Sequence, residues 1–169
     1  MDPWLLFVDL DGTMWDNPDI SMLTPPFRRI NSDVIVDSNS VVVRLYTGMA
    51  RLVEWARESN AITSTLSWNE PSIAIEALKA FGLLGLFDYI AIEPHPYKGD
   101  MAIRVLERVR KERGLKIPAC RIVYIDDRDI HLDDMVSKLG DIVFLRAWVD
   151  FKGVEDAITL ILNGLSRCG

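Results

Sequence analysis

The stretch Trp4-Leu5-Leu6-Phe7-Val8-Asp9-Leu10-Asp11-Gly12-Thr13 decides the fold class of this chain. Its first five residues are all apolar, which is typical of a strand covered on both faces in a parallel sheet. Asp9 and Asp11 follow. Because alternate residues of an extended chain face the same way, we expect both carboxylates to point into one space. Two such charges repel each other unless a cation separates them, so the pattern indicates a site for a divalent ion such as Mg²⁺.

Alternating helices and strands fill most of the remaining chain. We expect strands at 61–66, 88–92, 121–125 and 142–145, separated by helices at 49–59, 71–81, 100–113, 130–139 and 154–164. Two β-branched runs, 34–36 and 41–43, flank a turn-prone segment and predict a hairpin. The alternation predicts an α/β fold of one domain, residues 1–169: a three-layer sandwich around a Rossmann-like, doubly wound parallel sheet, with the hairpin inserted at about 28–46. Ligands of such folds bind at the carboxyl ends of the strands.

The composition is that of a globular protein, with 49% hydrophobic and 26% charged residues. A formal net charge of −6 without a basic run argues against nucleic acid as a partner. No apolar run approaches the roughly 20 residues that cross a bilayer, and the amino terminus lacks a basic signal-peptide region, so we expect a cytoplasmic protein outside the membrane. Cys120 and Cys168 lie outside any C-x-x-C motif, and we interpret them as two ordinary thiols.

A second pair of acids, Asp126-Asp127, follows the predicted strand 121–125. Doubled carboxylates at the end of a buried strand have little structural purpose, although a helix cap is the competing interpretation, and Asp129 alone could provide that cap. The two pairs together make a divalent-cation site the better interpretation. A calcium loop starting at Asp9 is excluded, because Met14 and Ile20 stand where that loop needs glycine and glutamate.

A hydroxyl and a lysine complete the candidate site. Ser67 closes the strand 61–66, where its hydroxyl and the amides of the next helix could hold phosphoryl oxygens; Thr65 is the alternative for this role. Lys98 precedes a predicted helix, where its charge opposes the helix dipole and calls for a counter-anion. His95 and His131 have no partner at metal-ligand spacing, and we interpret both as structural or rim residues.

In chain order, Asp9-Leu10-Asp11-Gly12-Thr13, Ser67, Lys98 and Asp126-Asp127 resemble the four motifs of the haloacid dehalogenase superfamily. A closer likeness is to the magnesium-dependent phosphatase family, acid phosphatases with a minimal cap. It rests on Trp15, Pro25-Pro26-Phe27, Val43-Arg44-Leu45-Tyr46, the double aspartate and Ser137-Lys138-Leu139-Gly140. Gly12 departs from that family, whose members carry a bulkier residue there. The likeness implies a haloacid-dehalogenase-like hydrolase in which the hairpin takes the place of the cap domain.

The resemblance also implies an activity: hydrolysis of phosphomonoesters through an aspartyl-phosphate. Asp9 would be the nucleophile and Asp11 the general acid and base. Mg²⁺ would be held by the Asp9 carboxylate, the Asp11 backbone carbonyl and Asp127, with Asp126 close by. The other positions implied are Ser67 and Lys98 as catalytic phosphoryl-binding residues, with Gly12, Thr13, Trp68 and Asn69 as further substrate contacts. A flap this small predicts an open site for varied substrates, such as sugar phosphates or phosphotyrosine in a peptide.

Three other functions compete with a phosphatase. A dehalogenase would keep Asp9 but has no leaving alcohol to protonate, so it would have no need of Asp11. A phosphoacceptor switch domain also combines acids, a hydroxyl and a lysine, but it carries its acidic pair on the first strand and its acceptor aspartate on a middle strand. A non-catalytic binding homologue is disfavoured because every expected catalytic position is filled.

Overall fold

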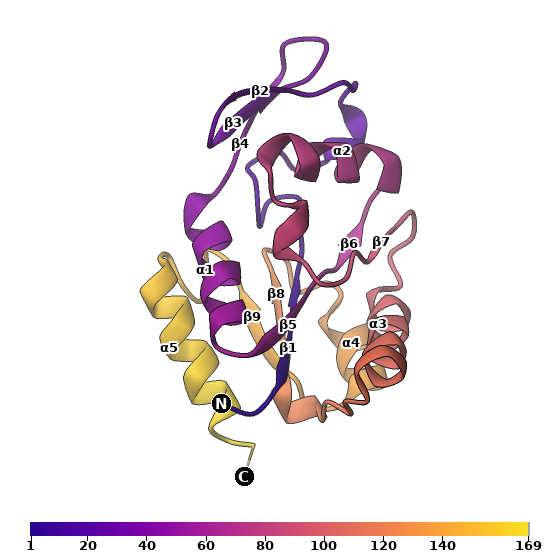
Figure 1. The fold of residues 1–169 in the computed structure, drawn as a ribbon, viewed down its shortest axis with the longest axis vertical. Coiled ribbons are helices and arrows are strands. Elements are labelled where there is room, and N and C mark those ends of the chain that lie inside the picture. Colours follow the sequence, from indigo (N-terminus) through magenta and orange to yellow (C-terminus); the bar gives the residue numbers. More distant parts are fainter. Residues whose placement is uncertain (169) are drawn as a thin grey trace.

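Strand β1 (Trp4–Val8) lies inside the main sheet of the computed structural model, which describes residues 1–168 (Figure 1). The sheet has the order β5-β1-β8-β9, from β5 (Ala61–Thr65), β8 (Ile122–Asp126) and β9 (Val143–Arg146), and all its pairs are parallel. Successive β1 residues belong to opposite cores. Leu6 and Val8 lie in one apolar cluster and Leu5 and Phe7 in another. The predicted strand covered on both faces is confirmed.

Helices cover both faces of this sheet, as Figure 1 shows. Helices α1 (Thr47–Glu58) and α5 (Val154–Leu165) pack together on one face, and α3 (Lys98–Arg113) and α4 (Leu132–Leu139) on the other. The predicted three-layer, doubly wound α/β fold is therefore confirmed. Within the described residues, no helix is both long and apolar enough to cross a membrane.

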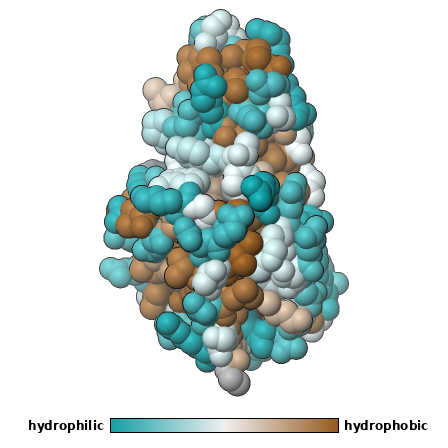
Figure 2. Space-filling view, turned by 90° about the vertical axis from the view of Figure 1, so that its left-hand side faces the viewer, coloured by the Kyte–Doolittle hydropathy of each residue, from teal (hydrophilic) through white to brown (hydrophobic). Residues whose placement is uncertain are grey.

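The insertion after β1 forms a flap at the end of the molecule to which the strands point (Figure 1). It contains the predicted hairpin, β3 (Val34–Val36) with β4 (Val42–Arg44), and a further antiparallel strand, β2 (Arg28–Asn31). The flap packs on α2 (Pro71–Phe81), which in turn contacts the short helix η1 (Ile20–Met22). Figure 2 shows the flap as a narrow projection above the broader body.

The strand predicted at 88–92 is largely replaced by an irregular segment. Asp88 and Tyr89 both donate their backbone N–H to the Thr63 carbonyl, and only a single bridge joins Tyr89 to Ser64. A regular ladder starts at β7 (Ile92–Glu93), which pairs with β6 (Ser67–Trp68) instead of joining the main sheet. The Asp88 carboxylate accepts a hydrogen bond from the Thr63 backbone N–H at 2.9 Å. This N–H is therefore not available to pair with a neighbouring strand.

The interpretation of the two cysteines as ordinary thiols was wrong. Cys120 and Cys168 form a disulfide, with their Cα atoms 5.3 Å apart. It joins the short helix η3 (Ala119–Arg121), which leads into β8, to the segment after α5. Sequence spacing did not indicate it, because 48 positions separate the two residues.

The packing of α5 on β9 depends on a glycine. A Cβ atom at Gly164 would lie 2.6 Å from a methyl carbon of Val143, so either the helix or the strand must move. We expect Gly164→Ala to lower the free energy of unfolding by about 1–3 kcal/mol, measured by urea denaturation. Gly48→Ala in α1 is the control, because nothing lies within 4 Å of its Cβ, and it should be neutral or stabilising. Equal stability of the Gly164→Ala variant and the wild type would contradict this packing.

Candidate active site

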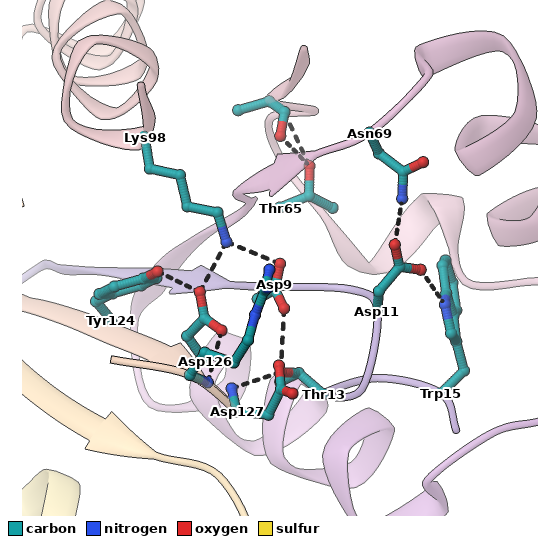
Figure 3. A network of polar contacts seen from close by, with 12 residues as sticks. Asp9, Asp11, Thr13, Trp15, Thr65, Asn69, Lys98, Tyr124, Asp126 and Asp127 are labelled. Carbon is teal, nitrogen blue, oxygen red and sulfur yellow. Dashed lines mark hydrogen bonds and ion pairs between the residues drawn. The ribbon is translucent and has the colours of Figure 1, made fainter. Parts of the chain in front are cut away.

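Three carboxylates gather where β1 and β8 end. Asp9 directly follows β1, Asp126 is the last residue of β8, and Asp127 follows it. One carboxylate oxygen from each residue lies within 4.8 Å of the corresponding oxygens of both other residues. Figure 3 shows the three side chains together. Because β1 and β8 are parallel neighbours, their carboxyl ends meet at one edge of the sheet. The structure thus brings together three of the four acids expected at this edge.

The Lys98 ammonium lies between two of these acids. It is fully buried at the first turn of α3 and donates to Asp9 at 2.9 Å and to Asp126 at 2.7 Å. Burial alone would lower the pKa of Lys98, but the two carboxylates raise it above its ordinary value, so the ammonium stays charged. The predicted counter-anion of Lys98 is therefore the carboxylate cluster itself.

The environments of Asp9 and Asp126 differ. Burial, aided by the charges of Asp126 and Asp127, raises the pKa of Asp9 to about 8 despite the opposing effect of Lys98. Burial would also raise the pKa of Asp126, but Lys98, the Tyr124 hydroxyl and the Arg128 amide all donate to its carboxylate and hold its pKa below the ordinary value. The three donors thus favour the charged form of Asp126, whereas burial and the neighbouring acids favour the protonated form of Asp9.

Gly12 and Thr13 bring the two acidic loops into contact. Gly12 has a φ of +71°, and a Cβ there would lie 2.6 Å from an Asp127 carboxylate oxygen, so the position requires glycine. The buried Thr13 hydroxyl accepts from the Asp127 amide at 2.9 Å and donates to the Asp127 carboxylate at 3.1 Å. Asp9 offers a second acceptor at 3.3 Å. Thr13 therefore links the loop after β1 to Asp127.

The Asp11 side chain points away from the cluster (Figure 3). It accepts from the Trp15 indole at 2.8 Å, the Ile20 amide at 3.1 Å and the Asn69 side-chain amide at 2.8 Å. The expectation that Asp9 and Asp11 point into one space is wrong. The extended chain ends with β1 at Val8, and the amides of Thr13 and Met14 then donate to the Leu10 carbonyl in a turn. Burial raises the pKa of Asp11 to about 6, although these hydrogen bonds oppose the shift.

The two hydroxyls proposed for phosphate differ in their hydrogen bonds. Thr65 is committed to the backbone of Ala91, accepting from its amide at 2.8 Å and donating to its carbonyl at 3.3 Å. Ser67 is buried in β6, and its hydroxyl makes no hydrogen bond to any residue that the structure describes. The free hydroxyl therefore favours Ser67.

A groove opens over Asp11. Its volume is about 380 Å³, and its walls come from the segment around η1 and from the loop after β6. Trp68, which is 47% exposed, lies in one wall, and Asn69 lies beside it. Besides Asp11, the charged residues that line the groove are Asp19, Glu70 and Arg128. No strand of the flap lines this groove; the flap supports the η1 segment instead, through Asp37, which accepts the Thr24 amide at 2.9 Å.

Several residues at the site were not predicted. Tyr124 lies two positions before Asp126 in β8, a spacing that could have indicated it, whereas Trp15 contacts Asp11 through a turn that the sequence did not reveal. His131, interpreted as structural or rim, is buried with its ring edge-on to Trp68. Asp134 accepts the Gly99 amide at 2.8 Å and thereby fixes the start of the helix that carries Lys98.

Three solved structures are similar to this chain in fold. A haloacid dehalogenase superfamily hydrolase from Ehrlichia chaffeensis has a TM-score of 0.62 at 13% identity, covering 95% of this chain and 97% of that one. A phosphoserine phosphatase, solved as a phospho-aspartyl intermediate analogue, has a TM-score of 0.57 at 11% identity over 95% and 100% of the two chains. The 3-deoxy-D-manno-octulosonate 8-phosphate phosphatase of Moraxella catarrhalis, solved with magnesium and phosphate ions, has a TM-score of 0.50 at 16% identity over 96% and 87%.

Sequence comparison identifies the family. No curated protein matches the chain. The family model described as Acid Phosphatase matches residues 2–142, which contain both acidic pairs, Ser67 and Lys98. The matched region also contains the whole flap and four of the five α-helices of the described structure. The chain therefore belongs to the acid phosphatase family, and it has the fold of the haloacid dehalogenase superfamily hydrolase.

Proposed function

We propose that this protein is a magnesium-dependent phosphatase that hydrolyses small phosphomonoesters through an aspartyl-phosphate on Asp9. The observation that carries the proposal is the buried cluster of Asp9, Asp126 and Asp127 around Lys98, with Asp11 held separately beside it. One group of acids would bind a cation, and the separate acid would transfer protons.

The donor set fits a magnesium ion. Three carboxylates face one ammonium, so two negative charges remain uncompensated when all the acids are ionised. All the cluster's donors are oxygens, which Mg²⁺ prefers, and neither histidine nor cysteine belongs to it. Asp9 and Asp127 would hold the ion together with the Asp11 carbonyl, whereas Asp126 is committed to Lys98 and Tyr124. The magnesium and phosphate ions solved with the Moraxella catarrhalis enzyme support this choice. A bound Mg²⁺ would neutralise charge on the phosphoryl oxygens.

The two aspartates of the first loop would have separate tasks. An ionised Asp9 would attack phosphorus, and the P–O bond to the leaving alcohol would break as Asp11 gives its proton to the leaving oxygen. Asp11 would then take a proton from water as the water attacks the aspartyl-phosphate, which releases phosphate and restores Asp9. A pKa of about 6 allows Asp11 to hold and release a proton near neutrality. Lys98 and the free Ser67 hydroxyl would bind the phosphoryl oxygens.

The groove over Asp11 would hold the leaving group. Its volume of about 380 Å³ suits a small organic phosphate. Its exposed Trp68 offers an apolar face, and the neighbouring carboxylates can accept hydrogen bonds from hydroxyl groups. Sugar phosphates combine both features. A phosphotyrosine side chain is a second candidate, because Asp11 lines the groove and Trp68 in its wall is exposed.

The role of Asp9 is tested by substitution. We expect Asp9→Asn to lose at least about 10⁴-fold in kcat for p-nitrophenyl phosphate, because the nucleophile is gone. Its melting temperature in chelator should stay close to that of the wild type, because the asparagine side-chain oxygen can still accept from Lys98 and Asp126 still pairs with that ammonium. Chelator should abolish wild-type activity, and magnesium should restore it. The control is Asp133→Asn, an exposed acid of α4, which should keep wild-type activity. A wild type indifferent to chelator, or one that accumulates a stable phosphorylated form, would contradict the proposal.

The role of Asp11 predicts a pH profile that depends on the leaving group. Asp11 must be protonated to act as an acid, so its competent fraction falls above its pKa of about 6. For an alkyl phosphate, kcat/KM should fall about tenfold per pH unit above that value. For p-nitrophenyl phosphate, whose leaving group needs no proton, the decline should be absent. Stopped assays between pH 5 and 9 measure both, and parallel profiles for the two substrates would rule out Asp11 as the acid.

A further inference from the structure

We propose that Trp148 is a positioning residue for the cation site, an inference that rests on the proposed function. Its indole N–H donates to the Gly12 carbonyl at 2.8 Å, across 136 positions of sequence. Gly12 directly follows Asp11, whose backbone carbonyl is a proposed ligand. Trp148 would therefore set the distance between two loops: the one that carries Asp9 and Asp11 (the nucleophile loop) and the one that carries Asp126 and Asp127 (the Asp127 loop).

Trp148 belongs to a segment that holds both loops at once. Arg146 donates from Nε to the Asp127 carbonyl at 3.1 Å, and the Ala147 amide donates to the Asp126 carbonyl at 2.9 Å. Trp148 adds the bond to Gly12. Three consecutive residues thus donate to the backbone of both acidic loops, and Trp148 alone reaches the nucleophile loop.

The Trp148 side chain is itself firmly held. Its backbone has a φ of +66°, a left-handed conformation that residues other than glycine rarely adopt, so the surrounding contacts must maintain it. Its ring packs 4.5 Å from the Tyr46 ring and 5.8 Å from the Phe151 ring, measured between centroids. The Asp150 carboxylate accepts the Arg146 amide at 2.6 Å and closes the turn. A maintained unfavourable conformation beside a site is typical of residues with a functional constraint.

The ion site would be sensitive to this contact. Gly12 is so close to Asp127 that a Cβ atom at Gly12 would lie 2.6 Å from the Asp127 carboxylate. A small displacement of Gly12 would move the Asp11 carbonyl and Asp127 relative to each other. Magnesium demands near-ideal octahedral geometry, and groups that orient its ligands commonly change metal affinity by about 10–100-fold.

The test compares two indole hydrogen bonds. Trp148→Phe removes the N–H and keeps an aromatic ring. Trp4→Phe is the matched control, because the Trp4 indole donates to the Ser59 carbonyl at 2.9 Å from the amino-terminal end of β1, away from the site. We expect Trp148→Phe to weaken Mg²⁺ binding, measured by isothermal titration calorimetry, by about tenfold or more. Trp4→Phe should bind Mg²⁺ within twofold of the wild type, although it should lose at least as much thermal stability in chelator.

The possible outcomes separate the two proposals. Suppose that the wild type binds magnesium and that Trp148→Phe does not weaken this binding, or weakens it no more than Trp4→Phe does. That result overturns the positioning role alone. A wild type that binds no magnesium overturns the proposed function and the positioning role with it. If Trp148→Phe does not fold, Arg146→Lys replaces it, because it removes the Nε–H donor to the Asp127 carbonyl but keeps the positive charge. It should weaken Mg²⁺ binding in the same direction, and unchanged binding would overturn the positioning role.

Discussion

The buried Lys98 ammonium is the contact on which the site depends. It joins the ends of β1 and β8 by bridging Asp9 and Asp126, and it is fixed in place because Asp134 holds the start of α3. A buried charge is tolerated only when it is paired and hydrogen-bonded, so lysine and acids require one another. The pairing nevertheless leaves the cluster with surplus negative charge. The fold thus builds a stable cluster whose uncompensated negative charge would attract a cation.

Environment divides the labour among four aspartates that lie close together. The Asp126 carboxylate is paired with Lys98 and hydrogen-bonded by Tyr124, whereas Asp9 and Asp127 keep raised pKa values that a cation would lower. Asp11 is turned toward Trp15 and Asn69, away from the proposed ion, and therefore can hold a proton that its neighbours would lose. Opposite tasks for similar carboxylates are a general device of enzymes. Here the turn after Val8 produces the separation.

Most of the fold and the central cluster could be predicted from sequence, because parallel strands bring their carboxyl ends to one edge. Asp9, Asp126 and Asp127 follow from that rule, and Lys98 follows from the cost of a cation at a helix start. The orientation of Asp11 did not follow, since the strand ends before it and the alternation rule no longer applies. The Cys120–Cys168 disulfide and the Trp148 contact with Gly12 also escaped prediction. Each joins residues far apart in the chain, without a local pattern that marks them as neighbours.

The central claim is that one divalent cation binds between the two acidic loops without contacting the Asp11 carboxylate. A crystal structure of the protein grown with Mn²⁺ in place of Mg²⁺, with the ion located by its anomalous scattering, tests this claim most directly. We expect a single peak in this region, coordinated by the carboxylates of Asp9 and Asp127 and the backbone carbonyl of Asp11, while the Asp11 carboxylate stays bonded to Trp15 and Asn69. An ion bound by the Asp11 carboxylate, or no ion at this cluster, would contradict the account.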